Sequence, residues 1–170
     1  MKKLNSPILI LFAFLMHGSC QKIETLPSVP HIEYRSFEVF DTIDILGNRA
    51  KGGKLKFYFE DGDGDIGMHP PEGEIIDTNN LILTLYRKTG GEMVLAPEND
   101  PLEPSSYRIP FMEREGINKI LKGTISVTFL YLFYNTTDTI RYDFHIKDRA
   151  ANLSNEASTN EIIISVNNTY

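Results

Sequence analysis

The chain is poor in the residues that disulfide frameworks and many catalytic sites use. It has one cysteine, no tryptophan and four histidines among 170 residues. A single cysteine excludes an internal disulfide. No Gly-x-Ser-x-Gly motif is present, and no two histidines have metal-ligand spacing, so the sequence holds no recognisable nucleophile and base. We therefore predict that the protein is not an enzyme.

Positive charge is also scarce. The chain has 17 lysines and arginines against 23 aspartates and glutamates, a formal net charge of −6. A net negative surface repels phosphate backbones, and no basic patch offsets it. The composition therefore excludes nucleic acid as a partner. Without tryptophan, stacking on a sugar ring would depend on tyrosine and phenylalanine.

Only one long apolar run occurs, and it lies close to the amino terminus. Ile8–Met16 follows Lys2 and Lys3 and precedes Gly18 and Ser19. The run is far shorter than the ~20 residues of a membrane-spanning helix. The order charged, apolar, small is that of a secretory signal. We predict that residues 1–19 are a cleaved signal peptide and that Cys20 becomes the first residue of the mature protein.

The cysteine stands where a lipid would be attached. His17-Gly18-Ser19-Cys20 resembles the bacterial lipoprotein cleavage box, with His17 at the position that usually holds leucine. The resemblance implies acyl chains such as palmitate on Cys20. Each buried methylene contributes about 0.8 kcal/mol to membrane binding. We expect the membrane to be a partner through this anchor.

The residues after the cysteine bear on localisation. Gln21-Lys22-Ile23-Glu24 is similar to the short tag of Bacteroidetes lipoproteins that are exported to the outer face of the outer membrane. This resemblance implies a lipid-anchored protein of the outer membrane, exposed at the cell surface. A plain flexible tether is the alternative, and it leaves the periplasmic face open. Residues 20–33, with Pro27 and Pro30 and no periodicity, are interpreted as that tether.

Strand-like alternation dominates residues 34–170. Leu55, Phe57 and Phe59 share one face, as do Ile140, Tyr142, Phe144 and Ile146; this period of two is typical of half-buried antiparallel strands. Gly90-Gly91 predicts a hairpin, and four prolines make 96–110 an irregular connection. Residues 117–121 fit either a short helix or an edge strand. Further strands are predicted at 34–45, 81–87, 92–95, 124–134 and 161–166.

These patterns predict an all-β fold, a single immunoglobulin-like antiparallel β-sandwich of about seven strands behind the cleaved lipoprotein signal peptide. Asp138 stands four residues before Tyr142 at the start of a strand. This arrangement resembles the tyrosine corner of immunoglobulin-like domains, which implies a buried ring whose hydroxyl bonds to nearby backbone. An ordinary alternating strand is the alternative.

The most informative segment is an aspartate loop at residues 59–67. Asp61, Asp63 and Asp65 are separated by single glycines, which permit backbone turns that bring the carboxylates together. Calcium takes six to eight oxygen ligands of this kind. The loop partly resembles an EF-hand, with Glu72 at the twelfth position. However, Ile66 replaces the sixth-position glycine and no helix-forming sequence flanks the loop, so an EF-hand is excluded.

A second loop is expected at the same end of the sandwich. Residues 147–155 follow the Ile140–Ile146 strand, so Asp148 and Asn152 would approach the aspartate loop and complete a calcium site. Two alternatives remain. Asp-Gly and Asp/Asn loops are good solvated turns, and Arg149 could pair with the acids in place of a cation.

Other features give weaker expectations. Asp41-Thr42-Ile43 and Asp138-Thr139-Ile140 resemble an acceptor motif for O-glycosylation in Bacteroidetes exported proteins, which implies Thr42 and Thr139 as glycosylation sites. The two loops together resemble small Bacteroidetes outer-membrane lipoproteins of unassigned function with an immunoglobulin-like domain. The expected function is a membrane-anchored binding or structural module, calcium-stabilised, with a protein or glycan partner. The alternative is an accessory scaffold lipoprotein of a glycan-uptake or envelope-assembly complex.

Overall fold

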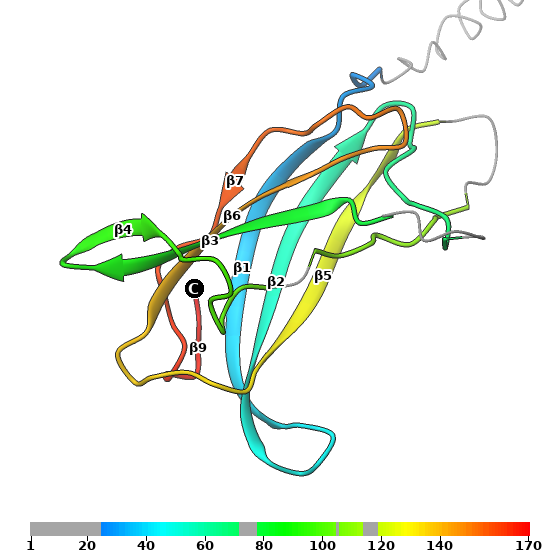
Figure 1. The fold of residues 1–170 in the computed structure, drawn as a ribbon. Coiled ribbons are helices and arrows are strands. Elements are labelled where there is room, and N and C mark those ends of the chain that lie inside the picture. Colours follow the sequence, from blue (N-terminus) through cyan, green and yellow to red (C-terminus); the bar gives the residue numbers. More distant parts are fainter. Residues whose placement is uncertain (1–24, 72–77, 105, 114–118) are drawn as a thin grey trace, which may run out of the picture.

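The structure is a computed structural model that describes residues 25–71, 78–104, 106–113 and 119–170. The predicted signal peptide, Cys20 and Glu72 lie outside the described residues, as do residues 117 and 118 of the 117–121 segment, whose last residue, Leu121, begins a strand. The described chain is all-β, as predicted, and forms two antiparallel sheets (Figure 1). Within these ranges no helix is long and apolar enough to cross a membrane.

The first sheet is built on a long hairpin. β1 (His31–Ile43) pairs with β2 (Arg49–Asp61) along its whole length. β5 (Leu121–Tyr131) adds to the other side of β2, and β9 (Asn168–Thr169) adds to β1, which gives the order β5-β2-β1-β9. The predicted inward face of β2, Leu55, Phe57 and Phe59, is buried.

The second sheet has the order β4-β3-β6-β7, with β8 also pairing to β6. Gly90 and Gly91 both have positive φ and close the predicted hairpin between β3 and β4. The strands are β3 (Leu81–Thr89), β4 (Glu92–Leu95), β6 (Thr139–Ile146), β7 (Ala157–Ser158) and β8 (Ile162–Ile163).

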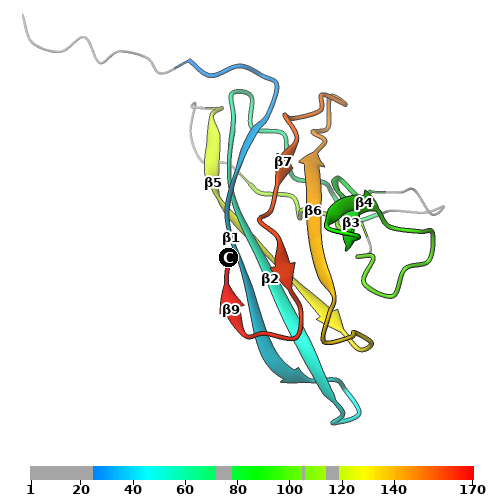
Figure 2. The same ribbon diagram turned by 90° about the vertical axis from the view of Figure 1, so that its left-hand side faces the viewer.

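The core lies between the two sheets. Phe57 of β2 meets Phe144 of β6 with ring centroids 5.3 Å apart, and Phe37 of β1 meets Tyr142 of β6 at 5.9 Å. Figure 2 shows β1 and β5 on one side and β3, β4 and β6 on the other. Burying this many large apolar side chains is the main stabilisation of a domain with no disulfide.

Both termini of the domain differ from the expectations. β1 begins at His31, so the last three residues of the predicted tether, 31–33, belong to the sheet. The strand predicted at 161–166 is wrong as one element. Within it only Ile162 and Ile163 form a strand, β8, because the chain turns after Ile163. The chain then crosses to β1, where β9 pairs and where Tyr170 and Phe37 exchange backbone hydrogen bonds.

Of the predicted tyrosine corner, only the burial of the tyrosine ring is confirmed. Tyr142 is fully buried, but its hydroxyl donates to the carbonyl of Leu102, 40 residues upstream, at 2.8 Å. It also lies 3.0 Å from the hydroxyl of Tyr131. Asp138 instead accepts from the backbone of Asn135 and pairs with Arg87. The hydroxyl therefore fastens the irregular 96–110 connection to the core rather than closing a local corner.

Candidate metal centre

The three aspartates of the predicted loop come together where β2 ends. One ligand oxygen from each of Asp61, Asp63 and Asp65 lies within 4.8 Å of the others. Asp61 is only 1% exposed, while Asp63 and Asp65 are half-buried. Such a group could hold a metal ion, since carboxylate oxygens are the ligands that hard cations take.

The loop is held in place by its own backbone and by the core. The Asp65 N–H donates to Oδ2 of Asp61 at 2.7 Å, and Gly64 takes a positive φ of 65° to make this turn. Ile66, the residue that excludes an EF-hand, is fully buried and fixes the end of the loop to the core. The Gly62 N–H donates to the carbonyl of Pro27 at 2.8 Å, so the amino-terminal segment crosses the loop.

Two carboxylate oxygens in the loop lack the partners that buried oxygens need. Oδ1 of Asp61 and Oδ1 of Asp65 are buried and accept no hydrogen bond from the part of the chain that the structure describes. A buried acceptor without a partner costs about 1–3 kcal/mol, and more when it is charged. Native proteins rarely leave such atoms without water, a partner or an ion.

The electrostatics of the loop are those of crowded negative charge. Burial raises the pKa of Asp61 to about 6; the hydrogen bond from the Asp65 N–H opposes this shift, and the nearby Asp63 adds to it. Burial also raises the pKa of Asp65, with further contributions from Asp148 and Asp63, while Arg149 opposes the shift. Desolvated like charges favour a bound cation or a proton.

The second loop reaches the first, as predicted. The Arg149 N–H donates to the carbonyl of Asp65 at 3.2 Å. Asp148 is 1% exposed, and its two oxygens accept from the backbone and side-chain nitrogens of Asn152, both at 2.8 Å. The group of acidic residues with close ligand atoms contains the three loop aspartates and not Asp148. Asp148 therefore contributes negative charge beside Asp65, while its hydrogen bonds shape its own loop.

Two other residues near the site point elsewhere. The guanidinium of Arg149 donates to the carbonyl of Gly67 and lies 5.0 Å from the centre of the Phe111 ring. The ring of His69 also stacks on the Phe111 ring, with ring centroids 3.9 Å apart. The hydrogen bond of Arg149 therefore goes to backbone rather than to a carboxylate.

Sequence reasoning missed the residue that joins these loops. Asn80 is fully buried; its amide donates to the carbonyls of Ile66 at 2.7 Å and Lys147 at 3.0 Å, and its oxygen accepts from the Ile109 N–H at 2.7 Å. It thus fixes the aspartate loop, the end of β6 and the 96–110 connection to one another. An asparagine directly before a strand gave no signal of this role.

The suggested glycosylation sites lie on strands. Thr42 is half-buried in β1, near the end of that strand, and Thr139 is half-buried at the start of β6, opposite Ile163.

No protein-family model, curated protein or solved structure matches the chain. The function must therefore be argued from the sites themselves.

Proposed function

We propose that this protein is a lipid-anchored, calcium-stabilised β module with a binding or structural role rather than a catalytic one. The observation that carries the proposal is the pair of buried carboxylate oxygens without hydrogen-bond partners in the aspartate loop, on Asp61 and Asp65. A divalent cation between them would satisfy both oxygens. It would also offset the burial that chiefly raises the pKa of both residues and the repulsion that adds to this shift.

Calcium suits this loop better than magnesium. Calcium accepts six to eight oxygens in flexible geometry, whereas magnesium demands a near-ideal octahedron and keeps several waters. The loop offers carboxylates from three closely spaced aspartates on an irregular backbone, with solvent access at the half-buried Asp63 and Asp65. Waters can complete the coordination. The role of such an ion is to fix the loop against the core.

We further propose that the two-sheet domain is immunoglobulin-like. With β1, β2 and β5 taken as strands A, B and E, the first sheet has the order A-B-E. With β4, β3, β6 and β7 taken as C′, C, F and G, the second has the order C′-C-F-G. An experimental strand order that placed β5 in the second sheet would reject this assignment.

The anchor would place the cation site near the membrane. The Gly62 N–H bonds to Pro27, so the amino-terminal segment leaves the domain beside the aspartate loop. Lipid on Cys20 would then attach at this end, and the opposite end of the sheets would point away from the bilayer. A module oriented in this way presents its far end to partners.

Thermal unfolding of residues 21–170 in EGTA and in about 10 mM calcium tests the proposal. Extracellular-type sites bind calcium at roughly 0.1–1 mM, and saturation near 100 times the Kd adds ~2.7 kcal/mol to the free energy of unfolding. We expect the Tm to rise by about 5–10 °C. Asp63→Asn should abolish the rise.

Glu60→Gln is the matched control. Glu60 precedes Asp61 on β2 and is half-buried, but it is outside the group of close carboxylates. Its removal takes one negative charge from the same neighbourhood, so the calcium-dependent rise should persist. An equal rise in the wild type and in Asp63→Asn, or no rise in the wild type, would reject the calcium site.

A further inference from the structure

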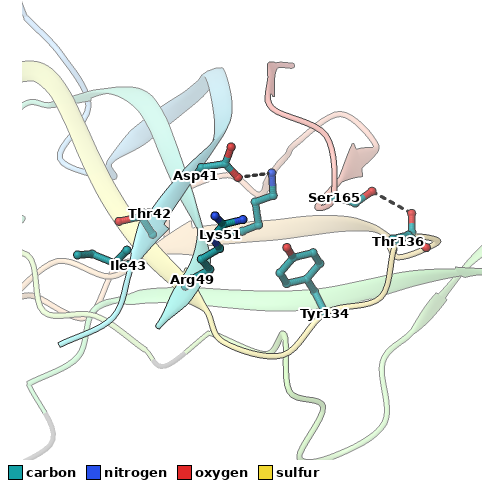
Figure 3. Close-up of a pocket in the computed structure, with 9 residues that line it drawn as sticks. Asp41, Thr42, Ile43, Arg49, Lys51, Tyr134, Thr136 and Ser165 are labelled. Carbon is teal, nitrogen blue, oxygen red and sulfur yellow. Dashed lines mark hydrogen bonds and ion pairs between the residues drawn. The ribbon is translucent and has the colours of Figure 1, made fainter. Parts of the chain in front are cut away.

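A second site lies at the opposite end of the sheets from the aspartate loop. A pocket of about 620 Å³ opens between the ends of β1 and β2, the segment after β5 and the segment after β8 (Figure 3). Arg49 lines this pocket and Asp61 belongs to the cation site, and they are the first and last of the 13 residues of β2. At ~3.3 Å per residue the two sites are about 40 Å apart.

One wall of the pocket is a closed polar network. Lys51 is 6% exposed, and its ammonium donates to Asp41 at 2.7 Å and to Oδ1 of Asn167 at 2.6 Å. The Asn167 amide in turn donates to the other oxygen of Asp41 at 2.7 Å. The charges of Lys51 and Asp41 balance each other, so this network holds the wall of the pocket in place.

The second cation in the pocket has no direct partner. Arg49 is exposed, and its guanidinium forms no hydrogen bond or ion pair within the described ranges of the chain. At longer range it acts on Asp41, whose pKa is lowered first by the hydrogen bond from Lys51 and in smaller part by Arg49. With Lys51 balanced by Asp41, Arg49 leaves the pocket locally positive on a chain whose net charge is −6. A planar guanidinium with free donors binds a carboxylate through two parallel hydrogen bonds.

The remaining lining favours a ligand with many hydroxyl groups. Four residues with side-chain hydroxyls are among those that line the pocket: Thr42, Tyr134, Thr136 and Ser165. Ser165 donates to the carbonyl of Thr136 at 2.9 Å, and Figure 3 shows this pair across from Arg49 and Lys51 with Tyr134 between them. Hydroxyls both donate and accept, so they suit the alternating donors and acceptors of a polyol.

Aromatic surface adjoins these polar groups. Tyr134 is 37% exposed, and its neighbour Phe133 is 73% exposed. Tyr134 itself lines the pocket, and ligand sites combine aromatic lining of this kind with a few polar groups. The apolar face of a sugar ring can stack on such a side chain while the sugar hydroxyls reach the polar lining.

We propose that this pocket binds a sugar acid, a small polyhydroxylated ligand whose carboxylate is held by Arg49. This inference gives the binding role in the proposed function a ligand class. It rests on other residues, so a calcium titration and a sugar-acid titration can fail separately. Its site is at the end of the domain that the proposed anchor leaves exposed.

Amide-shift titration of ¹⁵N-labelled residues 21–170 tests the proposal with three probes: D-glucuronate, D-glucose and acetate. We expect saturable shifts with glucuronate at residues 41–43, 49–51 and 134–136. The Kd for glucose and for acetate should be at least tenfold higher, because glucose lacks the carboxylate and acetate lacks the hydroxyl groups. Arg49→Met should raise the Kd for glucuronate at least tenfold, and Arg49→Lys should recover only part of this loss.

Arg35→Met is the matched control, since Arg35 lies on β1 and pairs with Glu33 at 2.8 Å, away from the pocket. It removes the same charge and should leave the Kd unchanged within twofold. The amide spectrum also reports whether each variant is folded. Acetate binding as tightly as glucuronate would reduce the site to a simple anion site and overturn the proposal. So would unchanged affinity in Arg49→Met, or no saturable shift with glucuronate.

Discussion

Asp61 is a carboxylate that the fold buries without satisfying. Its Oδ2 receives the Asp65 N–H, but its Oδ1 has no such donor among the described residues, and Asp63 and Asp65 lie beside it. The free energy of unfolding must therefore depend on how this charge is neutralised. A proton and a cation are the two available means, and they give opposite responses to pH.

In EGTA, acidification from about pH 7 to about pH 5 should stabilise the protein. The folded-state pKa of Asp61 is about 6, above the ordinary aspartate value, so the folded state binds a proton that the unfolded state does not bind in this window. The gain in the free energy of unfolding should be about 1–3 kcal/mol, and Asp65 shifts in the same direction. Urea unfolding at a series of pH values measures it.

Asp61→Asn provides the control for this response. Asparagine keeps an oxygen for the Asp65 N–H but cannot ionise, so in EGTA the variant should be more stable than the wild type at pH 7 and about equal near pH 5. In saturating calcium the wild type should instead lose stability on acidification, since protons compete with the ion for the carboxylates. A wild type that loses stability between pH 7 and pH 5 in EGTA contradicts the assignment.

Individual side chains could be predicted from the sequence where periodicity decides their burial. The inward positions of β6, Ile140, Tyr142, Phe144 and Ile146, are all buried. The partners of polar groups could not be predicted in the same way. The hydroxyl of Tyr142 finds Leu102 and the amide of Asn80 finds three separate segments, and such long-range pairings leave no local pattern in a sequence.

Among the elements, the strands of four or more residues were predictable and the two-residue pairings were not. β3, β4 and β6 lie within two residues of their predicted bounds because alternation and turn residues define them. The carboxy-terminal segment pairs first with the second sheet and then with the first sheet. Each pairing involves only two residues, which are too few to show a period in the sequence. The aspartate loop was placed correctly relative to the 147–155 loop because strand connectivity fixes which loops share an end.

Close backbone approach makes the aspartate loop sensitive at Gly62. A Cβ there would lie 2.1 Å from the carbonyl oxygen of Leu26 and 2.5 Å from that of Pro27. Both atoms are backbone, so the amino-terminal segment would have to move and the hydrogen bond from Gly62 to Pro27 would weaken. We expect Gly62→Ala to lower the free energy of unfolding by about 1–3 kcal/mol. Urea unfolding measures the change.

Gly123→Ala is the matched control within the same sheet. Its Cβ would meet the Phe59 ring at 3.5 Å, an ordinary contact, and neither glycine has a positive φ. The substitution should change the free energy of unfolding by less than ~0.5 kcal/mol. Equal effects of the two substitutions would show that contact with residues 26 and 27 does not hold the loop.

At the scale of the whole molecule, the two candidate sites and the chain end define an orientation. The described amino-terminal segment lies against the aspartate loop, and the Arg49 pocket lies at the other end of β2. Three exposed apolar residues lie in the turns that follow β1 and β5, close in sequence to residues that line the pocket: Ile45, Leu46 and Phe133. This arrangement has functional meaning only if the chain is anchored by its amino terminus.

Cys20→Ser tests that anchor in cells. The wild type should incorporate labelled palmitate and sediment with membranes, because two or more acyl chains bind a bilayer stably. The variant should lose both the label and the sedimentation.

The double variant Cys20→Ser, Ser28→Cys is the control. It restores a thiol at position 28, which no cleavage box precedes, so we expect it not to regain the label. Label on this double variant, or membrane association of Cys20→Ser equal to that of the wild type, would contradict the lipoprotein assignment.

Protease added to intact cells should then remove the wild-type domain if it faces outward. Survival of the domain until the outer membrane is opened would place it on the periplasmic face, where the Arg49 pocket would meet periplasmic rather than extracellular ligands.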